Sequence, residues 1–302
     1  MRQVAFLCLL AGGCAIAFAP ILVRLSDTGP VASAFWRTAL AAPLLLLAAV
    51  IPAQPAPARL RPGAGTQPGS AQPPERFLPS AGMLVAGLFF ACDLGVWHWS
   101  IVYTSVANST LLANLAPIFV TLAGWLIWKQ KVTRVFLVGM ITALVGMFVL
   151  VGPNFFVGGT RLLGDALGAL TGVFYAGYML AVKSARDAQA STVRLMAWST
   201  TITAIALLPV AVLSSQPMLP HALSGWWVLV ALAVVTQIMG QGLIAYAFAH
   251  LPASLSSVSL LIQPVMATLF AWVLFGENVG PAQLVGGAVV LAGIWLSKKG
   301  SD

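Results

Sequence analysis

Ten apolar segments, each close to the length that crosses a lipid bilayer, follow one another along this chain. An α-helix needs about 20 mostly apolar residues to span the hydrocarbon core of a membrane. The composition agrees, because 60% of the residues are hydrophobic and 7% are charged, whereas a soluble domain carries about 25% charged residues. We therefore predict an all-α integral membrane protein with ten transmembrane helices, at residues 4–23, 31–51, 79–102, 106–127, 134–151, 162–183, 194–213, 225–248, 253–275 and 281–297.

The connections between these segments are short, except at residues 52–78, which read PAQPAPARLRPGAGTQPGSAQPPERFL. Proline and glycine dominate this stretch, and large apolar residues are scarce. Such a composition cannot bury enough apolar surface to offset the entropy of ordering. We predict a disordered linker.

The first apolar segment resembles a signal peptide, because Arg2 precedes it and LLAGGC leads to Cys14. The apolar run continues to Val23, however, which is long enough to span a membrane. We predict a first transmembrane helix. Cys8, Cys14 and Cys92 fall within predicted spans without the spacing of metal ligands, and they are interpreted as small core residues.

Lysine and arginine are unevenly distributed between the two sides of the predicted bundle. With a cytoplasmic N-terminus, twelve of them lie in inside segments and two, Arg24 and Arg161, in outside loops. Cytoplasmic loops carry the excess of positive charge in membrane proteins. We expect both termini and the linker in the cytoplasm, and a bacterial-type inner (plasma) membrane location. The twelve inside residues are Arg2, Arg59, Arg61, Arg76, Lys129, Lys131, Arg134, Lys183, Arg186, Arg194, Lys298 and Lys299.

One segment occurs twice. LAPIFVTLAGWLIWKQKVT at 115–133 aligns with IQPVMATLFAWVLFGENVG at 262–280 at an offset of 147 residues. The offset corresponds to five helices, an odd number, so the second copy is inverted in the membrane. The cations at the end of the first copy then face the cytoplasm, and the uncharged residues at the end of the second face outside. Inverted repeats build alternating-access transporters with a site near mid-membrane. We predict repeats at residues 1–152 and 153–302.

These segments, together with GMITALVGMFVL and GGAVVLAGIWL about 20 residues after each, resemble the paired EamA-type domains of the drug/metabolite transporter superfamily. The resemblance covers nearly the whole chain. It implies ten helices, a central cavity, and export or exchange of amino acids, metabolites or drugs. The first copy has Gln130 where the family often has a glutamate, the position of Glu277 in the second, which indicates a loop-structuring role.

Two charged residues fall within predicted spans. Asp93 shares a helix face with Trp97, and His98 lies about 140° around the helix from Asp93, which argues against a joint metal site. Arg37 lies at a depth similar to that of Asp93. Each charge has a functional interpretation, in which Asp93 binds an amine or a proton and Arg37 binds a carboxylate. The alternative is a structural Arg37–Asp93 ion pair, and His98 has the alternative of a helix contact.

Polar and aromatic residues form stripes on several other predicted spans. They are interpreted either as interhelical hydrogen bonds or as the walls of a substrate cavity. Their aromatic members favour an aromatic or amphipathic organic substrate over a bare ion. The candidate substrate-binding residues are Arg37, Asp93, Trp97, His98, Asn114, Tyr175, Tyr178, Gln237, Gln241, Tyr246 and Gln263.

Several function classes are disfavoured by what the sequence lacks. It contains no G-x-x-x-x-G-K-[ST] phosphate loop, so transport is expected to be secondary. It has no basic patch interleaved with aromatic residues, so no nucleic-acid partner is expected. No cofactor, metal or enzymatic site is expected either. We predict a secondary transporter of small organic metabolites, with an integral-membrane enzyme or a small channel as the alternatives and with its oligomeric state open.

Overall fold

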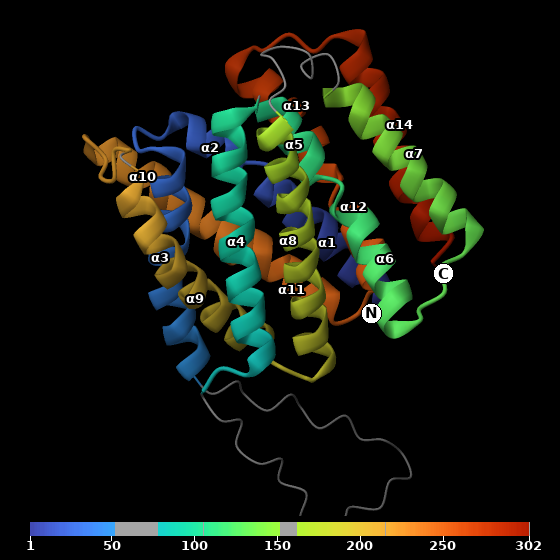
Figure 1. Ribbon diagram of the computed structural model, residues 1–302, viewed down its shortest axis with the longest axis horizontal. Helices are drawn as coiled ribbons and strands as arrows, with labels where there is room; N and C mark the ends of the chain where they lie inside the picture. The colour runs from blue at the N-terminus through green and yellow to red at the C-terminus, as the bar shows by residue number, and fades with distance from the viewer. Residues whose placement is uncertain (52–77, 105, 152–161, 215, 302) are drawn as a thin grey trace, which may run out of the picture.

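The computed structural model describes residues 1–51, 78–104, 106–151, 162–214 and 216–301. Within these ranges the chain is helical and contains no β-strand. Ten helical spans are long and apolar enough to cross a membrane, as the sequence predicts (Figure 1). The predicted linker at 52–78 lies outside the described residues, apart from Leu78. The predicted boundary between the repeats, at 152–153, also lies outside them.

Six of the ten spans are single helices, and four are divided. The single helices are α3 (Pro30–Val50), α4 (Ala81–Tyr103), α7 (Arg134–Val151), α8 (Leu162–Asp187), α9 (Thr192–Leu213) and α14 (Pro281–Lys299). The divided spans are α1 (Arg2–Ile16) with α2 (Ala19–Leu25), α5 (Val106–Ala113) with α6 (Ala116–Trp128), α10 (Leu223–Ala231) with η2 (Leu232–Gln241) and α11 (Gly242–Phe248), and α12 (Ala253–Ser259) with α13 (Ile262–Phe275).

The fourth and ninth spans break at nearly equivalent places, between α5 and α6 and between α12 and α13. Pro117 and Pro264 stand in the first turn of the helix that follows each break. Proline has no N–H to continue the preceding helix, and it fits the first turn of a new one. The spans predicted at 106–127 and 253–275 are confirmed, and the structure adds an interruption within each, which the pattern of apolar residues does not register.

Helices α7 and α14 form the tightest contact between the two repeats. A Cβ added at Gly139 would lie 2.4 Å from the Ser297 amide nitrogen, and one at Gly286 would lie 2.4 Å from the Leu150 amide nitrogen. At the offset of 147, Gly286 is the equivalent of Gly139, and Ser297 that of Leu150. The contact is thus made twice by the same surface, with the helices antiparallel, as an inverted two-fold requires.

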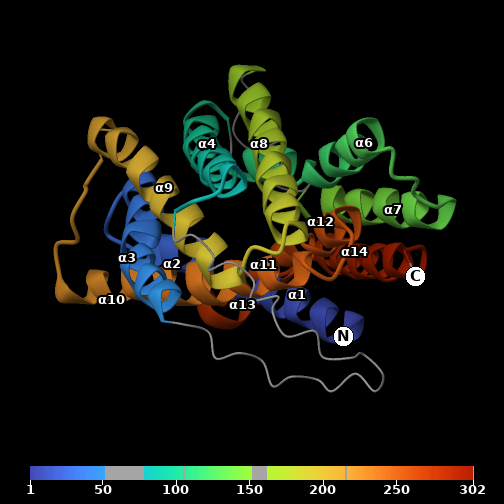
Figure 2. The ribbon, with the colours of Figure 1, turned by 90° about the horizontal axis from the view of Figure 1, so that it is seen from below.

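The remaining helix contacts show the same symmetry, because a contact between two spans recurs between the equivalent spans of the other repeat. Helix α1, in the first span, packs on η2 and α11 of the eighth span. The counterparts of these two spans are α8 and α4, which also pack on each other (Figure 2). Helices α3 and α9 are counterparts and pack on each other, and α6 of the fourth span packs on α12 of the ninth, its counterpart span. The bundle therefore consists of ten helices built from two inverted five-helix repeats.

Both chain ends lie on one side of the bundle, which we call the terminal side. Arg2 donates a hydrogen bond to the Ser301 carbonyl at 2.7 Å, and Thr133 donates one to the Gly300 carbonyl at 2.7 Å. Arg194 donates to the Leu78 carbonyl at 2.6 Å, which places the start of α4 on the same side. The other side, called the opposite side, carries the connections α2–α3, α9–α10 and α13–α14.

The outer surface is apolar, with exposed tryptophans at positions such as Trp99, Trp125 and Trp295. Cys8 and Cys14 are half-buried, but Cys92 is exposed, so the interpretation of Cys92 as a core residue was wrong. It projects from the face of α4 that turns away from Asp93, a distinction that span-level hydropathy does not make.

The α7–α14 contact predicts that its glycines tolerate no side chain. Alanine at Gly146 or Gly293 would place a Cβ within 2.5 Å of backbone atoms of the facing helix, which forces the helices apart. We expect each substitution to destabilise the protein by about 1–3 kcal/mol and to lower its unfolding temperature in detergent. Gly242→Ala is the matched control, because a Cβ there has nothing within 4 Å. Equal unfolding temperatures for Gly146→Ala and Gly242→Ala would contradict the close contact.

Candidate substrate site

Arg37 of α3 is held in the interior by an amide relay. Its Nε donates to Gln237 Oε1 of η2 at 3.0 Å, and Gln237 Nε2 donates to Thr200 Oγ1 of α9 at 3.0 Å. The side chain is buried, and its guanidinium carbon lies 5.7 Å from the centre of the Phe90 ring. Within the described ranges Arg37 makes no other hydrogen bond, so the two terminal nitrogens remain available to a planar anion.

Asp93 of α4 is buried close to this group but does not pair with it. Among the described residues no ion pair within 4.0 Å joins Arg37 and Asp93, although the two charges are within electrostatic range. The direct pair considered from the sequence is therefore not formed. A buried carboxylate without a cation costs free energy unless a partner reaches it.

Tyr175 and Tyr178 of α8 lie within electrostatic range of both buried charges. Their rings are 6.1 Å apart and nearly parallel, and the Tyr178 ring stacks on Phe90 at 4.6 Å. The Tyr178 hydroxyl donates at 3.1 Å to Oε1 of Gln241, which is the last residue of η2. The two tyrosines thus provide an aromatic wall beside the two charges.

The π-helical geometry of η2 positions both glutamines. A π-helix widens the turn, is rarely long, and occurs frequently at functional sites. Here it brings Gln237 to Arg37 and Gln241 to Tyr178. The sequence predicts both glutamines as site residues but gives no sign of the π-helix.

A second part of the candidate site lies beside the two helix breaks. Asn114, Tyr175 and Gln263 line a cavity with room for about one water molecule, together with Ser257 and Pro117. Asn114 Nδ2 donates to the Thr110 carbonyl at 2.8 Å, a carbonyl next to the break. Tyr175 therefore joins the aromatic wall to the broken helices.

A larger cavity opens from the terminal side above this one. Its volume is about 180 Å³, and α6, the α6–α7 connection, α8 and the first turn of α12 surround it. The two cavities are lined by neighbouring residues of α6, α8 and α12, and the smaller one lies deeper in the bundle. The larger cavity is lined by Val120, Thr121, Gly124, Trp128, Gln130, Val132, Leu180, Lys183, Ser184, Asp187, Ala253 and Ser254.

Three sequence-predicted residues lie apart from the central group. His98 is buried, donates a hydrogen bond from Nδ1 to the Leu94 carbonyl, and contacts the backbone of Pro30, which is the helix-contact arrangement. Trp97 meets the His98 ring edge to face at 5.0 Å. Tyr246 is partly exposed and lies 4.8 Å from the His250 ring at the end of α11.

Sequence reasoning missed several residues of the site. Thr200 and Phe90 are ordinary residues for an apolar span, and only the packed structure brings them to Gln237 and Arg37. Asp165 of α8 was also missed. Near the opposite side, Thr104 Oγ1 donates to the Asp165 carboxylate at 2.7 Å. The sequence signal that could have identified Asp165 is its position in the first turn of α8.

A solved crystal structure shares this fold. It superposes with a TM-score of 0.78 at 17% sequence identity, over 100% of this chain and 98% of the other. Curated relatives include the pseudopaline exporter CntI of Pseudomonas aeruginosa (strain UCBPP-PA14), 26% identical over 217 residues, which are 72% of this chain and 74% of the relative. A probable terminal-alkyne amino-acid exporter of Streptantibioticus cattleyicolor is 28% identical over 204 residues, 66% of each chain.

The model of the EamA-like transporter family matches residues 3–152 and 162–298, nearly the whole chain in two copies. The matches coincide with the two inverted five-helix repeats and with the paired domains that the sequence resembles. The helices, the internal charges and the exporter-named relatives agree on a transporter and not an enzyme. This multi-pass membrane protein belongs to the EamA-like transporter family.

Proposed function

We propose that this protein is a secondary transporter that exports small zwitterionic metabolites of the amino-acid type by alternating access. The observation that carries the proposal is the separation of Arg37 and Asp93, two buried opposite charges without an ion pair between them. A ligand with a carboxylate and an amine supplies each charge with its partner. The Tyr175–Tyr178 wall then receives the apolar part of the ligand.

The Arg37 end of the site favours a carboxylate. A guanidinium fork binds a carboxylate through two parallel hydrogen bonds, and the Gln237–Thr200 relay fixes the fork before any ligand arrives. Preorganised side chains lose less conformational freedom on binding. The name of the Streptantibioticus cattleyicolor relative, an amino-acid exporter, supports the same substrate class.

The direction of transport follows from charge and from the cavities. Twelve of the lysines and arginines fall on the terminal side or in the linker that leaves it, which supports a cytoplasmic terminal side. The 180 Å³ cavity opens on that side. A carrier in this conformation loads from the cytoplasm, in agreement with the exporter names of both relatives.

Counterflow in proteoliposomes tests the transport mechanism. With unlabelled amino acid inside, we expect saturable uptake of labelled amino acids that have apolar or aromatic side chains. Analogues that lack the amine or the carboxylate should compete poorly, because each leaves one buried charge without a partner. Flux that rises linearly with concentration and shows no counterflow would indicate a channel instead of a carrier.

A double-mutant cycle tests the two charges. We expect Asp93→Asn and Arg37→Ala each to lower the initial transport rate by about 10- to 100-fold, the range of a charged hydrogen bond. The double variant should recover stability, since neither charge is stranded, yet remain inactive because both anchors are gone. Lys131→Gln, an exposed charge change on the terminal side, is the control. A fully active double variant would rule out the binding role of both residues.

Side-specific labelling tests the orientation. Lys131→Cys and Leu219→Cys lie on the terminal and the opposite side, and both positions are exposed. In intact cells a membrane-impermeant maleimide should label Leu219→Cys, and Lys131→Cys only after the cells are opened, because the positive charge favours the cytoplasm. The unsubstituted protein measures labelling of the native cysteines. Labelling of Lys131→Cys from outside would reverse the assigned direction.

A further inference from the structure

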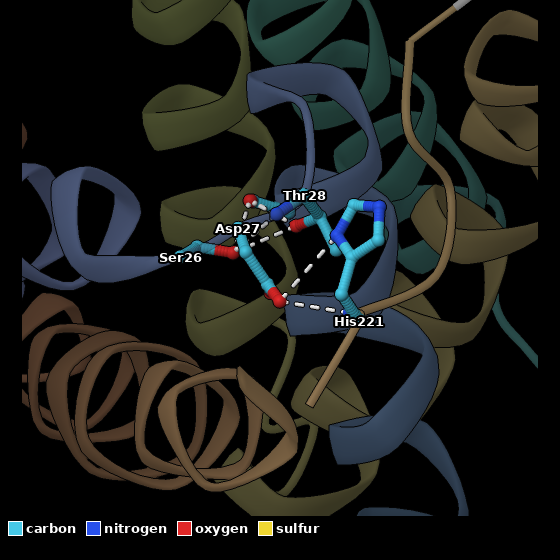
Figure 3. Close-up of polar contacts among 5 residues, drawn as sticks. Ser26, Asp27, Thr28 and His221 are labelled. Carbon is cyan, nitrogen blue, oxygen red and sulfur yellow. Dashed lines mark hydrogen bonds and ion pairs between the residues drawn. The ribbon is translucent and has the colours of Figure 1, made fainter. Parts of the chain in front are cut away.

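The opposite side of the bundle is closed by a turn of the first repeat that docks on a loop of the second. The His221 amide donates to Asp27 Oδ2 at 2.8 Å, and the imidazole Nδ1 lies 3.7 Å from the same oxygen (Figure 3). The Gly29 amide donates to the Pro217 carbonyl at 3.0 Å, and the Trp36 indole donates to the Met218 carbonyl at 2.7 Å. These bonds tie residues 27–36 to residues 217–221.

Asp27 remains ionised in this closure. The amide hydrogen bond from His221 lowers the pKa of the Asp27 carboxyl below its ordinary value. Ser26 and Thr28 flank it and bond to each other through their hydroxyl oxygens at 2.7 Å. The Asp27 carboxylate therefore accepts the hydrogen bond that joins this turn to residue 221.

An ion pair between the repeats completes the closure. Arg24, in the last turn of α2, pairs with Glu277, which follows α13. The Arg24 guanidinium also lies over the Phe275 ring, 4.6 Å from its centre. In this way the end of the first span of one repeat is fastened to the end of the fourth span of the other.

The equivalent place on the terminal side has the same backbone. Lys129 and Gly276 both end their helices in the left-handed region, with φ of 52° and 65°. The next amide turns back in both copies, from Gln130 to the Gly124 carbonyl at 3.0 Å and from Glu277 to the Ala271 carbonyl at 3.5 Å. Gln130 is thus the counterpart of Glu277 in position and in backbone conformation.

The side chains at these two places have different partners. Gln130 faces the 180 Å³ cavity, and Lys183 of α8 lines the same cavity. Helix α8 opens the second repeat, as α1 and α2 open the first, so Lys183 lies near the place that corresponds to Arg24. Lys183 instead pairs with Asp187 one turn along its own helix, at 2.7 Å.

We propose that the Arg24–Glu277 pair is a gate that holds the opposite side shut, and that Gln130 and Lys183 are its open counterpart on the terminal side, where an amide replaces the carboxylate. The inference rests on the proposed alternating-access function. Closing the terminal side would bring an amide, not a carboxylate, toward Lys183. Opening the opposite side breaks an ion pair and forms none in return, so the resting equilibrium favours the conformer that is open to the terminal side.

The size of this bias follows from exposure. The side chains of Arg24 and Glu277 are 61% and 46% exposed, so solvent screens the pair as it does other surface ion pairs. Such pairs correspond to changes of about 1.4- to fivefold in an equilibrium constant. A bias of this size sets which side a carrier without substrate presents, while a bound ligand can still reverse it.

Two cysteine probes measure the equilibrium without transport. Ser33→Cys lies one helical turn from Arg37 toward the opposite side and is fully buried, so it should react only when that side opens. Ser254→Cys lines the terminal-side cavity and should react in the resting state. Maleimide labelling rates at both positions, in purified protein without ligand, report the two conformers.

We expect Glu277→Gln and Gln130→Glu each to raise the Ser33→Cys labelling rate by about 1.4- to fivefold and to lower that of Ser254→Cys. The first variant removes the existing pair, and the second offers Lys183 a carboxylate. Arg24→Glu combined with Glu277→Arg should restore the original rates. Lys131→Gln, beside Gln130 but outside the cavity lining, should change neither rate.

The outcomes separate the gate from the transport function. Unchanged labelling in both Glu277→Gln and Gln130→Glu, or an equal effect of Lys131→Gln, would overturn the gate even if counterflow is measured. Shifted labelling in a protein without amino-acid counterflow would retain the gate and reject the proposed substrate class. Gln130→Glu removes no contact between the repeats, so it decides the question if Glu277→Gln fails to fold.

Discussion

Backbone polar groups inside a bilayer must find partners within the protein, and this requirement shapes the whole structure. A continuous helix meets it everywhere, and a broken helix meets it only where other groups reach the break. Beside the α5–α6 break, the Asn114 side chain donates to the Thr110 carbonyl, and the Thr268 hydroxyl of α13 donates to the Pro264 carbonyl. These two breaks adjoin internal polar side chains and the small cavity that Asn114 and Gln263 line.

The antiparallel contact of α7 and α14 joins the last helices of the two repeats, so that the repeats are related by an inverted two-fold. Gly139, Gly146, Gly286 and Gly293 let two helix backbones meet directly, and each helix offers the other an equivalent surface. At the ends of the fourth and ninth spans the backbone is the same on both sides, so there the two sides differ only in their side chains. The Gln130 and Glu277 positions show how small such a difference is, since backbone conformation is shared and one functional group is not.

The sequence predicts the spans well because the period and length of apolar runs report directly on lipid exposure. It does not predict the breaks, since Pro117 and Pro264 also fit within a kinked helix. The central group was found in part: Arg37, Tyr178, Gln237 and Gln241 are polar in apolar spans, but Thr200 takes its place only through the packing of α9 on α3. The terminal-side cavity depends on three helices from both repeats, and no local pattern encodes it.

The separation of Arg37 from Asp93 also explains why two costly charges would be kept in the interior. A direct ion pair would satisfy both groups and leave nothing for a ligand to gain. Here the Gln237–Thr200 relay satisfies only the Nε edge of the guanidinium, and the Tyr175–Tyr178 wall lies within electrostatic range of the carboxylate. On the proposed mechanism a zwitterion completes this network. Binding then removes the free-energy cost of burying two unpaired charges, and this gain is available to offset the loss of the ion pair when the opposite side opens.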